Sequence, residues 1–169
     1  TELVDSGGTA NGGDDTATLI AASTVTVTAQ GSEEISSNGK GSANATAIDA
    51  SGNHVVVWSE QYSDPCAWGI HAPRLDSTGS AQGAEIQINQ TTADDQRWAS
   101  VGMSDTGKFV VTWTSSNQDG TPSSIYARQF NADGSAAGDE FRVNTENTGA
   151  QSNASIDVDA SGNFIVVWQ

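Results

Sequence analysis

The stretch Asp49–Trp58 reads DASGNHVVVW, and it recurs as SDTGKFVVTW at Ser104–Trp113 and as DASGNFIVVW at Asp159–Trp168. The first and third copies are identical at 8 of 10 positions, and each copy follows the previous one by 55 residues. A fixed period of this kind is typical of proteins built from one recurring supersecondary unit. The residues that keep the spacing, and that we expect to maintain the fold, are Trp58, Trp113, Trp168, Gly52, Gly107 and Gly162.

One period carries the pattern of four antiparallel strands, separated by turns that contain glycine. In the second copy these strands are predicted at Ala99–Met103, Phe109–Thr114, Ile125–Phe130 and Glu140–Asn144. The second strand is almost continuously apolar, which predicts burial on both faces. The fourth alternates, which predicts a half-buried strand with Phe141 and Val143 facing inward. The fold class is therefore all-β, with tandem four-stranded antiparallel meanders that resemble β-propeller blades.

The repeat divides the chain into five segments. Residues 1–16 are rich in Gly and Asp and predict a flexible segment, and residues 17–45 predict strands that resemble a partial repeat. Residues 46–100 form the first repeat and residues 101–155 the second. Residues 156–169 form a partial third repeat, an open hairpin with no strand pair after it.

Charge and composition exclude several classes of function. The chain has 169 residues, with 6 Lys and Arg against 21 Asp and Glu, and a formal net charge of −15. Six scattered cations cannot form the basic surface that a phosphate backbone requires, so we expect no nucleic-acid partner. No apolar run approaches the roughly 20 residues that cross a bilayer, so we expect no membrane span. The single cysteine, Cys66, excludes an internal disulfide and cysteine-based zinc sites.

The predicted array has unmatched sheet borders at its two ends. An uncovered apolar edge strand such as Phe164–Trp168 recruits another strand. The border can be covered by strands of a second molecule, by further repeats of a longer protein of which this chain is a fragment, or by closure within the chain. The first alternative predicts self-association into a head-to-tail filament or ring.

The linked motifs IYARQF, NADGS, GDEFRVNT and DASGNFIVVW, within residues 46–169, are similar to repeats of large bacterial secreted and surface proteins. Many of those proteins are adhesin-like and carry haemolysin-type calcium-binding segments. The resemblance implies an extracellular or cell-surface setting in bacteria and frequent use of calcium, and it implies no reaction. The turn in SDTGKFVVTW also resembles the Asp-box of sialidase-type propellers, where the motif is structural.

The repeat serves as an internal control for candidate catalytic residues. His54 aligns with Phe109 and Phe164, and His71 aligns with Tyr126, so both histidines stand where an aromatic ring suffices. We therefore interpret them as packing residues and assign no catalytic residue.

Carboxylates in glycine-containing turns are candidate calcium ligands, because Ca²⁺ prefers hard oxygen atoms. They are Asp49, Asp76, Asp133 and Asp159, and the alternative is an Asx turn in which each side chain bonds its own backbone.

Aromatic residues found in one copy only are the candidate ligand-binding residues. Tyr62, Trp68 and Trp98, with the adjacent Arg97, are suited to stacking a sugar ring or to anchoring an interface.

These observations predict a non-catalytic extracellular structural or adhesive β-repeat protein that assembles by strand completion between subunits, and not an enzyme. The alternatives are a carbohydrate-binding module that recognises glycans, or a fragment of a larger propeller protein. Calcium is the one cofactor that the sequence suggests.

Overall fold

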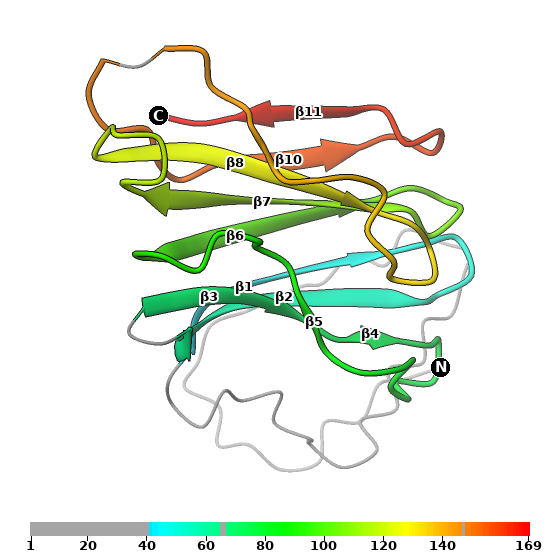
Figure 1. Cartoon of the computed structure of the whole chain (residues 1–169). Coiled ribbons are helices and arrows are strands. Elements are labelled where there is room, and N and C mark those ends of the chain that lie inside the picture. Colours follow the sequence, from blue (N-terminus) through cyan, green and yellow to red (C-terminus); the bar gives the residue numbers. More distant parts are fainter. Residues whose placement is uncertain (1–40, 65–66, 147) are drawn as a thin grey trace, which may run out of the picture. The chain divides into compact units, whose positions relative to one another are not determined.

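The computed structural model describes residues 41–64, 67–146 and 148–169, and these residues form antiparallel strands joined by turns (Figure 1). The predicted segment 1–16 and residues 17–40 of the predicted segment 17–45 lie outside the described residues, whereas residues 41–45 belong to β1. The strands are β1 (Gly41–Ile48), β2 (His54–Asp64), β3 (Ala67–Ala72), β4 (Arg74–Leu75), β5 (Ile86–Gln87), β6 (Gln96–Met103), β7 (Phe109–Ser116), β8 (Ser123–Phe130), β9 (Phe141–Arg142), β10 (Ser155–Val158) and β11 (Phe164–Val167). Within the described ranges, no helix has the length and apolar character needed to cross a membrane.

The strands form three sheets, which follow one another in chain order (Figure 1). The first has the order β1-β2-β3-β5, with β4 also paired to β2, and the second has the order β6-β7-β8-β9. The third sheet contains β10 and β11. Consecutive antiparallel strands in each sheet confirm the predicted all-β fold of propeller-blade-like meanders.

The shared glycines form the turn between the first two strands of each sheet. Gly52, Gly107 and Gly162 have φ values of +84°, +82° and +92°, a conformation that glycine adopts without steric cost. In the first of these turns the amide of Gly52 donates to the carbonyl of Asp49. The same bond forms at Gly107 and Gly162, so one turn geometry begins every sheet.

The sheets pack face to face through alternate residues of their strands. Val55, Val57 and Ile70 of the first sheet meet Val111 and Trp113 of the second sheet in one apolar cluster. The opposite face of the second sheet meets the third. Its Val110 and Ala127 pack with Ile156, so β7 is buried on both faces, as its apolar run predicts.

The second and third sheets approach closely at Gly102. A Cβ atom at this position would lie 2.5 Å from Cγ2 of Val158, so no larger residue fits without movement of the sheets. The positions one period before and after Gly102 are Ala47 and Asp157. Among the three copies, glycine at this position is therefore found in the second sheet alone.

The fourth strand of the second sheet differs from the predicted alternation. Phe141 is 38% exposed, whereas Asn144 is buried. The reason is a hydrogen bond: the amide of Ile125 donates to Oδ1 of Asn144 at 2.8 Å, and Asn89 accepts the same bond from Ile70 in the first sheet. A buried asparagine thus completes the backbone pairing where β5 and β9 end.

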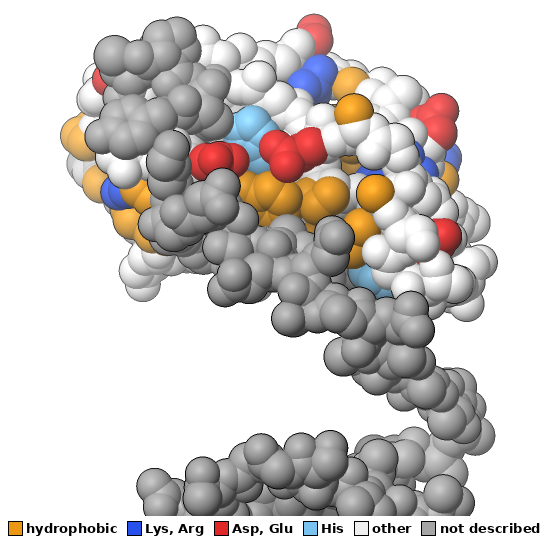
Figure 2. Space-filling model, turned by 90° about the horizontal axis from the view of Figure 1, so that it is seen from below, with side chains coloured by type: hydrophobic (Ala, Val, Ile, Leu, Met, Phe, Trp, Pro, Cys, Tyr) orange, Lys and Arg blue, Asp and Glu red, His pale blue; other side chains and the backbone are white. Residues whose placement is uncertain are grey.

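The outermost sheets expose different chemistry. Ile165 and Val167 of the third sheet are 66% and 58% exposed, on the face that corresponds to Val55 and Val57 in the first sheet. Figure 2 shows one face of the molecule, where hydrophobic side chains border a histidine flanked by acidic groups. In the first sheet, the face opposite to its core residues carries His71, since His71 stands opposite Trp58 and alternates with Ile70.

The three equivalent tryptophans provide a matched test of sheet packing. Trp113 is fully buried and stacks on Tyr126 at a centroid distance of 6.5 Å, whereas Trp168 is 40% exposed. We expect Trp113→Ala to lower the free energy of unfolding by about 3–5 kcal/mol, because it opens a cavity between two sheets. We expect Trp168→Ala to lower it by at most about 1 kcal/mol. Urea denaturation of both variants measures the difference, and equal losses would contradict the packing described.

Candidate functional site

Trp68, Arg97 and Trp98 come together at one end of the first and second sheets, and we call them the aromatic–arginine cluster. The guanidinium carbon of Arg97 lies 3.9 Å from the centroid of the Trp68 ring and 5.9 Å from that of Trp98. The first distance is that of a close cation–π contact. The structure thus brings three of the four residues predicted for ligand binding into one group.

A β-bulge positions Trp98. The register between β6 and β7 shifts between Arg97 and Ser100, and Trp98 has a φ of +55°. This left-handed conformation is uncommon for bulky residues and costs on the order of 1–3 kcal/mol. The bulge turns the indole outward, so that 43% of Trp98 is exposed beside Arg97.

The equivalent position just before the third sheet has the same backbone conformation with a different residue. Asn153 stands one period after Trp98 and has the same φ of +55°. Asparagine tolerates this conformation well, whereas tryptophan does not. Ser123 and Ser152 stand one period after Trp68 and Arg97. All three members of the aromatic–arginine cluster are therefore departures from the repeat, and the fold does not require any of them.

A hollow of about 630 Å³ adjoins the aromatic–arginine cluster. Asp95 links the two, because it lines the hollow while its Oδ1 accepts a hydrogen bond of 3.3 Å from the amide of Trp68. Its Oδ2 lies 4.0 Å from Nε of Arg97, which is longer than a hydrogen bond. The residues that line the hollow are Ala67, Thr92, Ala93, Asp94, Asp95, Ser116 and Asn117.

The site therefore combines an aromatic surface with polar groups. Nε of Arg97 is buried and has no hydrogen-bond partner among the described residues, so stacking on Trp68 holds the guanidinium in place. The exposed indole of Trp98 offers an apolar ring face, and Asp95 and Asn117 offer oxygen and nitrogen atoms beside it. Comparison of the copies did not select Asp95 as a site residue. Its position three residues before Trp98 in the sequence is the one feature that indicates its place in the site.

Tyr62 lies in β2, but its side chain is outside what the structure describes. Cys66 is also outside the described residues. Whether Tyr62 joins the aromatic–arginine cluster stays a prediction.

The four carboxylates predicted to bind calcium accept hydrogen bonds within their own turns. Asp49 and Asp159 accept from the amides of the residues two and four positions later, and Asp76 and Asp133 accept from nearby hydroxyl groups and amides. Hydrogen bonds from Thr78 and Ser80 lower the pKa of Asp76, and those from Ser135 lower the pKa of Asp133. These are Asx turns, and calcium binding at them stays a prediction.

No protein-family model matches the sequence, and no curated protein matches it. Among solved structures, the chain is similar to an endo-arabinase from Bacteroides thetaiotaomicron VPI-5482, with 17% identity and a TM-score of 0.46 over 76% of this chain and 50% of the other. It is also similar to a thermostable family-43 glycoside hydrolase, with 13% identity and a TM-score of 0.44 over 76% of this chain and 47% of the other. The chain spans about half the length of these two structures.

This finding corrects two predictions from the sequence. The first prediction was a non-catalytic structural or adhesive protein that assembles head to tail by strand completion, and the second was that the chain is not an enzyme. Both predictions are wrong, because the solved structures found are glycoside hydrolases.

Replacement of Trp98 tests the backbone strain at the bulge. We expect Trp98→Asn to raise the free energy of unfolding by about 0.5–1 kcal/mol, because asparagine adopts a positive φ with little cost. Trp98→Val removes the same ring but is β-branched, and we expect it to lower that free energy by about 1 kcal/mol or more. Thermal and urea denaturation compare the variants, and equal stability of the two would refute the strain.

Proposed function

We propose that the chain is a section of a larger β-propeller protein and that the aromatic–arginine cluster is a carbohydrate-binding surface. The observation that carries the proposal is Trp98, an exposed indole held in a strained backbone conformation where the third copy of the repeat has asparagine. Strained residues concentrate at functional sites, because only a gain in function offsets their cost in stability.

The open face of the third sheet supports the larger propeller. Ile165 and Val167 are exposed at positions equivalent to Val55 and Val57, which pack the first sheet onto the second. An apolar sheet face of this kind needs a cover. A further blade of the same repeat would cover this face and would pack on it as the second sheet packs on the first.

The chemistry of the cluster supports a sugar as ligand. A sugar ring has apolar faces that stack on an indole and hydroxyl groups that need hydrogen-bond partners. Trp98 offers the first, and Arg97, Asp95 and the hollow beside them offer the second. The net charge of −15 repels acidic polysaccharides, so the proposed ligand is a neutral glycan.

Binding to a panel of soluble neutral and acidic polysaccharides tests this function. We expect the unmodified chain to bind one or more neutral members in affinity electrophoresis and calorimetry. Trp98→Asn keeps the bulge but removes the stacking surface, and it should weaken binding about 5- to 30-fold, as expected for loss of an aromatic anchor worth about 1–2 kcal/mol.

Asn153→Gly provides the matched control, since it changes the equivalent residue of positive φ without touching the cluster. Its affinity should equal that of the unmodified chain. Unchanged binding by Trp98→Asn, or no binding to any neutral polysaccharide, would refute the proposal.

A further inference from the structure

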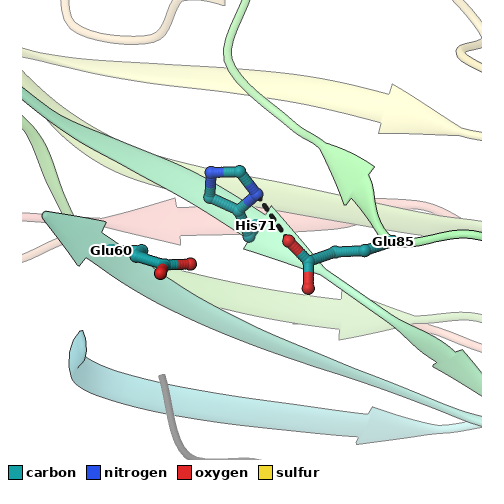
Figure 3. A group of neighbouring side chains, drawn as sticks. All are labelled: Glu60, His71 and Glu85. Atoms are coloured by element: carbon teal, nitrogen blue, oxygen red, sulfur yellow. Dashed lines mark ion pairs between the residues drawn. The ribbon is translucent and has the colours of Figure 1, made fainter. Parts of the chain in front are cut away.

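A second group of chemically reactive side chains lies on the opposite face of β3 from Trp68. His71 stands opposite Trp58 of β2, so Glu60 lies diagonally beside it on the same face. Glu85 directly precedes β5, in which Gln87 is paired with His71. Three adjacent segments of the first sheet thus direct Glu60, His71 and Glu85 toward one point (Figure 3).

The three side chains are close enough to share one ion. Nδ1 of His71 lies 2.8 Å from Oε1 of Glu85, and one ligand atom from each of the three residues lies within 4.8 Å of the others. Ligands bound to one first-row divalent ion at about 2.1 Å are separated by about 3–4 Å. Small rotations of the carboxylates therefore suffice to bring all three atoms onto a common ion.

The two ring nitrogens of His71 have different surroundings. Nδ1 contacts the carboxylate of Glu85, whereas Nε2 is buried and has no hydrogen-bond partner among the described residues. Because Nδ1 is the nitrogen on the side of Glu85, an ion shared by the three side chains would bind Nδ1 and replace its direct contact with Glu85 (Figure 3).

The second sheet shows what the fold needs at these positions. One period after Glu60, His71 and Glu85 stand Ser115, Tyr126 and Glu140. There Tyr126 stacks on Trp113, and the carboxylate of Glu140 accepts hydrogen bonds from Thr91 and Gln118. The fold therefore needs neither His71 nor Glu60, since the second sheet has other residues at both positions. Only the first sheet combines these two side chains with the glutamate that both sheets share, which is Glu85 in the first sheet.

We propose that Glu60, His71 and Glu85 form a binding site for one divalent cation of the zinc type. One imidazole nitrogen and two carboxylates suit Zn²⁺ and its first-row neighbours, whereas Ca²⁺ and Mg²⁺ take oxygen ligands. The cation offsets the repulsion between two neighbouring carboxylates on a chain of net charge −15. Glu85 is 45% exposed on its side chain, which leaves the site open to solvent.

Isothermal titration of the whole chain with ZnCl₂, after removal of metals with a chelator, tests the site. We expect one ion per chain and a thermal midpoint raised by at least about 5 °C when free Zn²⁺ is 100-fold above Kd. His71→Tyr and Glu60→Ser install the residues of the second sheet, which should preserve folding. Each should weaken Zn²⁺ binding at least about 10-fold.

Asp159→Asn, at an exposed Asx turn, is the control and should bind Zn²⁺ as the unmodified chain does. Equal binding by His71→Tyr would mean an adventitious ion only and would overturn the proposal, as would no Zn²⁺ binding or a preference for Ca²⁺. His71→Tyr should leave the affinity for polysaccharide unchanged. The metal site and the carbohydrate-binding surface are therefore tested independently of each other.

Discussion

The contact on which the structure depends is the apolar packing on both faces of β7. Neighbouring residues of this strand point to opposite sides, so Val111 and Trp113 pack against the first sheet while Val110 packs against the third. If a strand buried on both faces shifted its register by one residue, the side chains of each face would move to the other face and would no longer fit the sheet packed there. Because both neighbouring sheets are aligned to β7, the positions of their loops, and of every site at the sheet ends, follow from it.

Much of this arrangement could be predicted because the repeat encodes it at every level. The period of 55 residues, the turn glycines and the apolar strands each indicate the same four-stranded unit. The fourth strand was harder to predict, since Phe141 and Val143 alternate with polar residues as if buried. The burial of Asn144 depends on its bond to the amide of Ile125, a contact 19 residues away in the chain that no local pattern contains.

The candidate site was accessible from the sequence only in part. Comparison of the copies selects Trp68 and Trp98 as departures from the repeat, and the structure brings them together through Arg97. The strain at Trp98 was not predictable, because a bulge is a property of strand pairing. The group around His71 was missed for a similar reason: comparison with Tyr126 considers the histidine alone, whereas its chemistry depends on Glu60, a diagonal neighbour on another strand.

The close approach at Gly102 has a consequence for how such an array can change over time. Repeats of equal length invite recombination that duplicates, deletes or exchanges whole units. Here the missing side chain at Gly102 accommodates Val158, and the equivalent positions carry alanine and aspartate. A transplanted unit would therefore meet a neighbour shaped for a different partner, and the seam between the second and third sheets is specific even though the backbone plan is shared.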